Sequence, residues 1–342
     1  MIAAFDYFAR YSGMLSWMRR RCVNGATILM YHKVLPDTLA AAYPSANLVV
    51  STADFNLQMA WLARSYRVLT VRDAISALAR DTGRGERPIA CVTFDDGYRD
   101  NFDYAAPILE SHGLRATFFV CTGFIQGTAI WFDRAAVAWR RNAAAAMRRA
   151  SDAAPERRED FGRVSSIDAL FTALKNLSPE VRKTVVEAMD TPALELDDVF
   201  GPMRPDHVRA LCERGHEIGA HSVTHPFLTS LDNVALEFEL RESQSQASAY
   251  AGRQVDGFCY PSGDADERVM AAARAAGYQY ACAVRRGIAE AGSNRMDLPR
   301  RAILSPKSRR FSEAHFEGEV VGWRDLVRGY RKWLSSMGLS LL

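Results

Sequence analysis

The chain of 342 residues lacks several features that define whole classes of protein. It contains no run of about 18 consecutive apolar residues, which is the length that a membrane-spanning helix needs. It also has little excess charge, because 43 basic residues against 40 acidic ones leave a formal net charge of +3. That balance argues against a nucleic-acid-binding protein, and 48% hydrophobic residues argue against a disordered chain. What remains is a globular protein long enough to bury a large core.

Cysteine is sparse and shows no pairing pattern. The six cysteines are spread along the chain without a CxxC pair, at Cys22, Cys91, Cys121, Cys212, Cys259 and Cys282. Cys91 and Cys121 lie in apolar, strand-like runs, so we expect buried thiols rather than disulfides. At the N-terminus, Asp6 interrupts the apolar residues and the basic cluster Arg19–Arg21 follows them, which is the reverse of a secretory signal. These features predict a cytoplasmic protein.

Both ends of the chain are expected to form helices outside the main fold, over residues 1–21 and 306–342. In the second segment, Val320, Trp323 and Val327 recur at helical spacing among arginines, as in an amphipathic helix. Two interpretations stay open. The tail can dock on the body of the protein, or the terminal helices can make peripheral contact with a membrane surface.

Between these ends, short apolar runs alternate with helical patterns. The predicted strands are apolar runs with abrupt ends, over Ala26–Tyr31, Ile89–Phe94, Ala116–Cys121, Glu217–Ala220, Gly257–Tyr260 and Gln279–Val284. Patterns such as Ala53–Arg64 and Leu231–Tyr250 predict helices between them. The alternation predicts an α/β fold in which parallel strands form a barrel over residues 22–305. In such folds, catalytic groups gather at the carboxyl ends of the strands.

One long stretch, residues 127–205, breaks this alternation. It is rich in alanine, arginine and acidic residues and has few strand signals, so we expect a helical insertion on a barrel loop. Such an insertion can cover a site as a lid, or it can be a solvated decoration with no role in substrate choice.

Two polar motifs follow predicted strands. In the first, T-F-D-D-G-Y over Thr93–Tyr98, two adjacent carboxylates end an apolar strand. Burying two carboxylates together is costly unless a cation relieves the cost, although acidic residues also cap helices. In the second, H-S-V-T-H-P, His221 and His225 lie four residues apart and can converge on one divalent metal, or can be one surface and one core histidine. A third segment, F-C-Y-P-S-G over Phe258–Gly263, can expose backbone N–H groups to a ligand.

Together and in this order, the three motifs resemble the polysaccharide deacetylase family, also called the NodB-homology or carbohydrate esterase 4 family. The likeness spans roughly residues 26–126 and 206–305 and includes the upstream run Leu29–Val34. The resemblance implies a distorted (β/α) barrel, in agreement with the alternation of strands and helices. It also implies a metal-dependent hydrolase that removes an N-acetyl group from an amino sugar of a polysaccharide, a cell-surface glycan or its precursor.

Carried over position by position, the resemblance implies that Asp96, His221 and His225 hold a divalent metal, most simply Zn²⁺. It implies that Asp95 is the general base and that the backbone N–H of Ser262 faces the oxyanion. Two departures stand out. Cys259 occupies the position where many family members have an arginine that steadies the base. No late Leu-x-His segment supplies the usual general acid, so His32, at the end of the first predicted strand, is our candidate, with a structural role as the alternative.

The remaining candidates would contact substrate. They are polar or aromatic residues near strand ends, and core packing or a surface position is the alternative for each: Tyr98, Trp131, Tyr260, Pro261 and Arg300. The leading hypothesis is therefore an N-deacetylase whose partner is an N-acetylated sugar or glycan. Its rivals are a deformylase or other amidase on an amino-sugar lipid, a non-catalytic glycan-binding module and a metal-stabilised scaffold.

Overall fold

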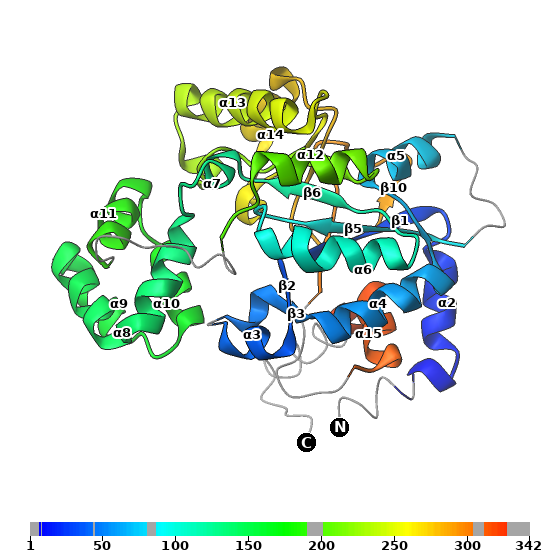
Figure 1. The fold of residues 1–342 in the computed structure, drawn as a ribbon, viewed down its shortest axis with the longest axis horizontal. Helices are drawn as coiled ribbons and strands as arrows, with labels where there is room; N and C mark the ends of the chain where they lie inside the picture. Colours follow the sequence, from blue (N-terminus) through cyan, green and yellow to red (C-terminus); the bar gives the residue numbers. More distant parts are fainter. Residues whose placement is uncertain are drawn as a thin grey trace.

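A computed structural model of the protein describes residues 7, 9–43, 45–80, 87–189, 201–303 and 311–326. At its centre lies a curled sheet of nine strands with helices packed around it (Figure 1). The strands run in the order β10-β1-β5-β6-β7-β8-β9, with β11 paired to β1 and β4 paired to β5. All described pairs of this sheet are parallel except β1–β10. The strands are β1 (Gly25–Tyr31), β4 (Arg67–Val68), β5 (Ile89–Phe94), β6 (Thr117–Val120), β7 (Glu217–Ala220), β8 (Gly257–Cys259), β9 (Tyr280–Cys282), β10 (Ala289–Glu290) and β11 (Arg301–Ala302).

Helices cover this sheet, and a small parallel pair, β2 (Lys33–Leu35) with β3 (Val49–Ser51), lies beside it. The α-helices are α2 (Met14–Arg21), α3 (Asp37–Ala42), α4 (Thr52–Ser65), α5 (Val71–Ala79), α6 (Ala106–Ser111), α7 (Thr122–Ile125), α8 (Trp131–Ala153), α9 (Arg158–Gly162), α10 (Ile167–Lys175), α11 (Pro179–Met189), α12 (Pro205–Glu213), α13 (Asn233–Ala251), α14 (Glu267–Ala276) and α15 (Glu313–Val320). A π-helical turn, Asn101–Ala105, precedes α6. Short 3-10 turns occupy Ala46–Leu48, Pro155–Arg157, Leu228–Ser230 and Pro261–Gly263.

The local signals that predicted these elements are visible in the structure. The central strands β1 and β5 are buried along their whole length, because helices pack on the sheet. The Ser51 side chain accepts a hydrogen bond from the third residue of α4 and so caps that helix. Gly277 ends α14 in the left-handed conformation that glycine adopts without strain. The predicted distorted (β/α) barrel with a helical insertion is confirmed.

The two ends of the curled sheet are joined by one late segment. Leu298 exchanges backbone hydrogen bonds with Ala281 and Ala283 on the β9 side. Three residues further on, β11 begins and pairs with β1 at Leu29 and Met30. The chain between them carries Arg300 into the centre of the fold, which proves decisive for the site.

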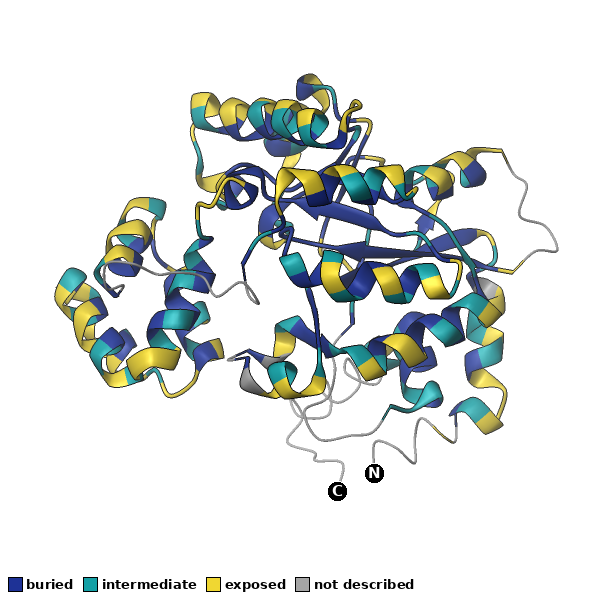
Figure 2. Cartoon of the chain, viewed as in Figure 1, coloured by how far each residue is buried: buried dark blue, intermediate teal, exposed yellow. Residues whose placement is uncertain are grey.

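The residues that break the strand–helix alternation form a helical lobe. Helices α8 to α11 lie to the left of the sheet in Figure 1 and enclose an apolar cluster of their own, built on Phe161, Leu170, Leu174 and Val185. Their outer faces are exposed, whereas the central strands of the sheet are buried (Figure 2). The lobe thus has an independent core, and it approaches the sheet through the start of α8.

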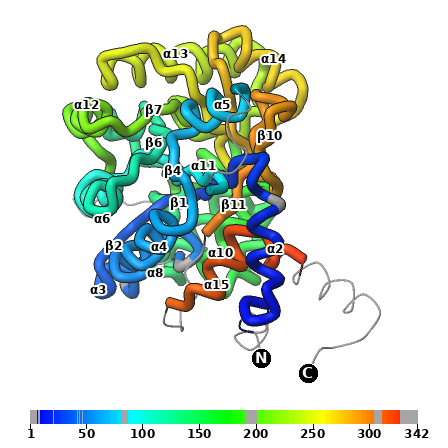
Figure 3. The backbone as a smooth tube through the Cα atoms, turned by 90° about the vertical axis from the view of Figure 1, so that its right-hand side faces the viewer, coloured from blue at the N-terminus to red at the C-terminus, as the bar shows by residue number. Residues whose placement is uncertain are grey.

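The terminal helices α2 and α15 lie side by side at the other end of the molecule (Figure 3). Ala9 and Leu15 pack there against Val321, with Met18 and Trp323 at the margin. Of the amphipathic tail expected over residues 306–342, the structure describes residues 311–326. The remainder lies outside the described residues. Among the residues that the structure describes, no helix has the length and apolarity of a membrane crossing. All six cysteines are free, and Cys91 and Cys121 are buried as predicted.

Candidate active site

Four strands deliver polar residues to one cavity at the carboxyl edge of the sheet. Its volume is about 260 Å³. His32 follows β1, Asp95 and Asp96 follow β5, His221 follows β7, and Ser262 follows β8, and all of them line it. The other lining residues are Met30, Asn47, Leu48, Trp131, Phe132, Phe171, Lys175, His225 and Val284. The cavity therefore combines a polar floor with a largely apolar wall.

Backbone strain is concentrated at this edge. In the described chain, the non-glycine residues with positive φ are Asp96 (75°), Ser222 (64°), His225 (58°) and Ser262 (57°). All four belong to the three motifs singled out in the sequence. A side-chain-bearing residue in the left-handed region costs free energy and persists only where surrounding structure enforces it. The fold thus maintains strained turns where they aim functional groups into the cavity.

Asp96, His221 and His225 converge on one point. The Asp96 Oδ1 atom lies 3.5 Å from His221 Nε2 and 3.4 Å from His225 Nε2. The nearest ligand atoms of the three side chains all lie within 4.8 Å of one another. Both Asp96 oxygens are buried without a hydrogen-bond donor among the described residues. An unbonded buried carboxylate is costly, so this donor set fits a divalent cation.

The two histidines differ in their surroundings. His221 Nδ1 lies 2.7 Å from the carbonyl oxygen of Cys259, which places a proton on Nδ1 and leaves Nε2 to face Asp96. Burial lowers the pKa of His221, but the neighbouring carboxylates of Asp96 and Asp95 outweigh burial and raise it in the metal-free chain. A cation bound between Asp96 and His221 would take the place of a proton on His221 Nε2. Burial lowers the pKa of His225 to about 4, so its imidazole is neutral.

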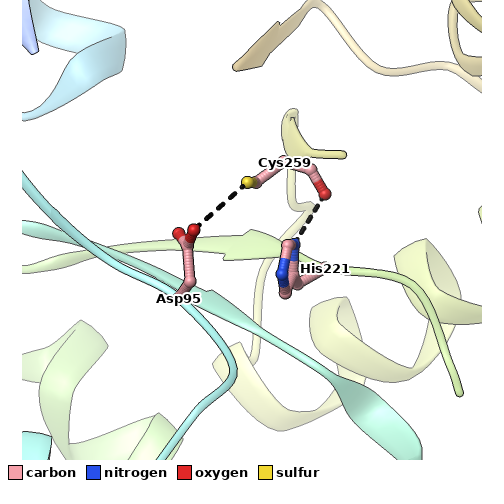
Figure 4. A group of neighbouring side chains, drawn as sticks. All are labelled: Asp95, His221 and Cys259. Atoms are coloured by element: carbon pink, nitrogen blue, oxygen red, sulfur yellow. Dashed lines mark hydrogen bonds between the residues drawn. The ribbon is translucent and has the colours of Figure 1, made fainter. Parts of the chain in front are cut away.

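A second set of donors, Asp95, His221 and Cys259, also lies close together (Figure 4). The Cys259 Sγ atom is 3.7 Å from Asp95 Oδ2. However, the Arg300 guanidinium occupies the same place, with Nη2 only 2.9 Å from Cys259 Sγ. A fixed positive charge there disfavours a second cation, so the set with Asp96 is the better metal site.

Asp95 is held by Arg300 in a bidentate ion pair. Arg300 Nη1 and Nη2 donate to the two Asp95 oxygens at 2.7 and 2.8 Å, and Arg300 is only 1% exposed. Burial raises the pKa of Asp95, but the charge and hydrogen bonds of Arg300 outweigh it and hold the pKa well below its usual value. Arg300 was expected to contact substrate; the structure instead buries it behind Asp95, because the segment that closes the sheet passes there.

Glu239 of α13 is a functional candidate that the sequence did not reveal. Its Oε2 accepts the N–H groups of Val223 and Thr224 at 2.7 and 3.0 Å, and its Oε1 accepts the Thr224 hydroxyl at 2.5 Å. The carboxylate is buried and so fixes the strained turn that leads to His225. In the sequence, Glu239 is one of several acids on an amphipathic helix, and no local pattern sets it apart.

Replacing Glu239 by glutamine is therefore expected to weaken metal binding about 10- to 100-fold. The glutamine side chain cannot form the charge-assisted hydrogen bonds that the carboxylate accepts. Its NH₂ group would also face hydrogen-bond donors of the turn at Val223 and Thr224. Competition with a chromophoric chelator measures the affinity. Glu237→Gln, at an exposed residue of the same helix that pairs with Arg241, is the matched control. Equal affinities of the two variants would contradict a role for Glu239.

The residues expected to contact substrate divide into two groups. Trp131 lines the cavity, beside Phe132 and Phe171. Tyr98, Tyr260 and Pro261 are buried and do not line it. Tyr260 donates its hydroxyl proton to the backbone oxygen of Met296. Tyr260 and Pro261 lie one and two residues past the end of β8, and Tyr98 lies four residues past the end of β5. At both places the chain turns back into the core, so these residues are structural.

Tyr98 joins the helical lobe to the catalytic strand. Its hydroxyl donates to both oxygens of Asp133, at 3.0 Å each, and the Tyr43 hydroxyl donates to the same carboxylate at 3.3 Å. Lys33 lies over the Tyr98 ring, with its ammonium 3.1 Å from the ring centroid. Burial raises the pKa of Asp133 to about 7, although Lys33 opposes this shift. The first turn of α8 is thereby tied directly to the motif that carries Asp95 and Asp96.

Asp133 should make the free energy of unfolding fall as the pH rises from about 4 to about 7. Its pKa is near 3.9 in an unfolded chain and higher in the folded one, so the folded state binds the extra proton and loses that advantage as the pH rises. Asp133→Asn should flatten this dependence, with a residual slope from Asp100, whose pKa burial raises to about 6. Urea unfolding with a chelator at pH 5 and pH 8 measures it. Identical slopes in both proteins would refute the assignment.

Comparison with known proteins agrees with this geometry. The sequence model of the polysaccharide deacetylase family matches residues 82–281, which is more than half of the chain. The chain belongs to the polysaccharide deacetylase family, whose members are hydrolases acting on carbon–nitrogen bonds. A curated Bacillus subtilis (strain 168) protein, YxkH, named for polysaccharide deacetylase activity, is 32% identical over 106 residues. That match covers 31% of this chain and only 35% of YxkH.

Solved structures show the same fold at low sequence identity. The deacetylase PplD of Streptococcus pyogenes aligns with a TM-score of 0.56 at 18% identity, over 82% of this chain and 92% of that one. A de-N-acetylase of Aggregatibacter actinomycetemcomitans aligns with a TM-score of 0.56 at 15% identity, over 85% and 99%. IcaB of Ammonifex degensii aligns with a TM-score of 0.53 at 16% identity, over 88% and 97%. These similarities establish the barrel architecture.

Proposed function

We propose that this protein is a metal-dependent hydrolase that removes the N-acetyl group from an amino sugar of a polysaccharide, a cell-surface glycan or its precursor. The observation that carries the proposal is an ionised carboxylate, Asp95, next to the convergent Asp96, His221 and His225 in one cavity. Two structural relatives bear on the reaction: PplD is described as a deacetylase in complex with acetate, and the Aggregatibacter protein as a de-N-acetylase. We assign the catalytic unit to residues 22–305.

Asp96, His221 and His225 would hold the metal, most simply Zn²⁺, through one carboxylate oxygen and two imidazole nitrogens. When bound, the metal supplies Lewis-acid activation of water and of the amide carbonyl. Both imidazole rings are buried, and the Cys259 carbonyl oxygen fixes the orientation of His221. The protein therefore presents a preorganised set of ligands that needs little rearrangement on binding.

Asp95 acts as the general base in this proposal. Its carboxylate lines the cavity, while Arg300 behind it keeps it ionised and fixes its orientation. An ionised carboxylate can take the proton of the attacking water as the carbon–oxygen bond forms. Ser262 also lines the cavity, and in this proposal its backbone N–H donates to the oxyanion.

The lobe supplies the wall against which a sugar would pack. Trp131 and Phe132 meet edge to face, with ring centroids 5.4 Å apart, and Phe132 also meets the His225 ring at 5.1 Å. Aromatic faces suit the apolar C–H face of a pyranose ring. This arrangement favours the interpretation of the insertion as part of the substrate site.

His32 is our candidate for the group that protonates the departing amine. It lines the cavity with Asp95 and Asp96, and burial lowers its pKa even though both carboxylates oppose the shift. A neutral imidazole at this place can accept the proton that Asp95 has taken from the water and give it to the leaving nitrogen. We expect His32→Ala to lower kcat by about 10²–10⁴-fold with unchanged metal content. Near-normal turnover, with metal content checked by elemental analysis, would reject this role.

The proposed function is tested by acetate release. The purified protein, loaded with Zn²⁺, is offered N-acetylglucosamine oligosaccharides, and free acetate is measured with and without a chelator. We expect release that stops on chelation and returns with added metal. Formate release from N-formyl sugars without acetate release would favour a deformylase, and sugar binding without hydrolysis would favour a glycan-binding module. Either result would overturn the proposal.

A further inference from the structure

Lys175 is a cationic residue of the candidate active site to which the proposed mechanism gives no role. It is the last residue of α10 in the helical lobe, and it lines the same cavity as Asp95 and Asp96. Asp95 is paired with Arg300, and Asp96 faces the two histidines of the proposed metal site. Among the described residues that line the cavity, no further carboxylate is left to balance the charge of Lys175.

The helix that carries Lys175 fixes its place beside the cavity. Asp168, Phe171 and Lys175 recur at intervals of three and four residues, so they share one face of α10. The Asp168 carboxylate accepts hydrogen bonds from the Ser45 hydroxyl at 3.2 Å and from the Asn47 amide at 3.1 Å. Further along the same face, Phe171 and Lys175 line the cavity. The anchored helix therefore holds the lysine next to the space in which a sugar would bind.

The ammonium group of Lys175 has no anionic partner within the described part of the chain. Burial lowers its pKa, whereas a carboxylate in contact with it would raise the pKa. Asp168 lies two helical turns away, about 10 Å along the axis of α10, which is too far for an ion pair. A lysine at the end of a helix can bind the last carbonyl groups, but Lys175 donates no such bond to the described residues. Its position thus calls for an anion from outside the chain.

We propose that Lys175 selects an amino-sugar substrate that carries an anionic group, a phosphate or a carboxylate, next to the N-acetyl sugar. This inference rests on the proposed function and names its substrate class. The cavity of about 260 Å³ is smaller than the roughly 300–1,000 Å³ of most small-molecule sites, so one sugar and its substituent would reach both Asp95 and Lys175. Phosphate and carboxylate oxygens both accept charge-assisted hydrogen bonds from an ammonium group.

A different role for Lys175 would be to stabilise the oxyanion that forms on any N-acetyl sugar. The two roles have different kinetic consequences. Loss of an oxyanion contact lowers kcat for neutral and anionic substrates alike. Loss of a contact to a substituent acts on the anionic substrate and raises its KM. The ratio of kcat/KM between an anionic and a neutral substrate therefore separates them.

Acetate release from three compounds by the Zn²⁺-loaded protein tests the inference. They are the neutral methyl glycoside of N-acetylglucosamine, N-acetylglucosamine 1-phosphate, and an oligosaccharide in which N-acetylglucosamine alternates with glucuronic acid. We expect kcat/KM to be at least about tenfold higher for one anionic compound than for the neutral one, as a hydrogen bond between charged groups provides. The two anionic compounds distinguish a phosphate from a carboxylate as the source of the charge.

Lys175→Met removes the charge and keeps an unbranched side chain that suits a helix. It should reduce the preference to about twofold or less, mainly by raising KM for the anionic compound, and Lys175→Glu should reverse the preference. Lys183→Met is the matched control. It removes an exposed lysine of α11 that does not line the cavity, so the preference should persist.

Equal kcat/KM for neutral and anionic compounds in the unchanged protein would overturn the inference, as would an undiminished preference in Lys175→Met. A loss that is equal for all three compounds would assign the lysine to the oxyanion instead. If no compound released acetate, the proposed function would fail, and calorimetric binding of the same compounds would decide the inference separately. Tighter binding of an anionic sugar that Lys175→Met abolishes would support it, and equal binding of all three would overturn it.

Discussion

Asp95→Asn is expected to lower kcat for acetate release by about 10²–10⁴-fold while the protein keeps its metal. Asparagine has nearly the same shape and still accepts a hydrogen bond from Arg300, but it cannot take a proton from water. The effect should fall on kcat more than on KM, because the carboxylate acts in the transition state. Steady-state acetate release with parallel metal analysis measures both quantities.

The neighbouring substitution Asp96→Asn provides the contrast for this prediction. Asp96 has no hydrogen-bond donor among the described residues and faces both histidines, so its loss should release the metal. The two aspartates, adjacent in sequence, should therefore fail in different ways: one variant is loaded but inactive, and the other binds metal poorly. If Asp95→Asn lost its metal as readily as Asp96→Asn, the division of roles between them would be wrong.

Removing the Arg300 side chain should be almost as damaging as removing Asp95. Arg300→Ala leaves a buried carboxylate without its counter-charge, a change that costs about 3–5 kcal/mol of stability in buried ion pairs. Without the guanidinium, the largest effect that opposes burial is lost, so the pKa of Asp95 rises. We expect kcat/KM to fall and its acidic limb to move to higher pH. Arg300→Lys should give an intermediate loss, because it keeps the charge but only one of the two hydrogen bonds.

Cys259 offers a rescue experiment for the same ion pair. Its sulfur lies 3.7 Å from Asp95 Oδ2 and 2.9 Å from Arg300 Nη2, so an arginine at position 259 would enter the space that Arg300→Ala vacates. The double variant Cys259→Arg with Arg300→Ala should recover part of the lost kcat/KM. Cys259→Ala alone should stay near the original activity. Recovery would show that Asp95 needs a guanidinium partner; its absence, in a folded double variant, would count against this positioning role.

Much of the fold could be predicted from the sequence because its signals are local. The strands β5 and β7 are short apolar runs that end abruptly in polar motifs, and parallel strands bring those ends to one edge. The convergence of Asp96, His221 and His225 follows from the same rule. The π-helical turn Asn101–Ala105 before α6 was not predicted. Pro107 lies just after it and has no N–H to continue a regular α-helical ladder.

The contacts that complete the site could not be predicted, because they join residues that are distant in sequence. Arg300 and Asp95 are separated by 205 positions, and nothing around Arg300 indicates which carboxylate it meets. Glu239 resembles the other acids of α13 until the turn before His225 folds onto it. The aromatic wall depends on how the helical lobe packs against the sheet. The helical periodicity of the lobe predicts only which of its residues face the core of the lobe. Local sequence patterns do not indicate which distant residues will meet in the folded protein.

The place of Arg300 in the chain has a consequence for synthesis. The residues proposed to hold the metal are all present once residue 225 has been made, whereas the ion pair that orients Asp95 awaits the segment that closes the sheet. A growing or truncated chain can therefore capture metal before its base is fixed, and should acquire full hydrolytic competence only after the last strand has docked. The family match ends at residue 281, so this late arginine lies outside the region by which the chain is recognised.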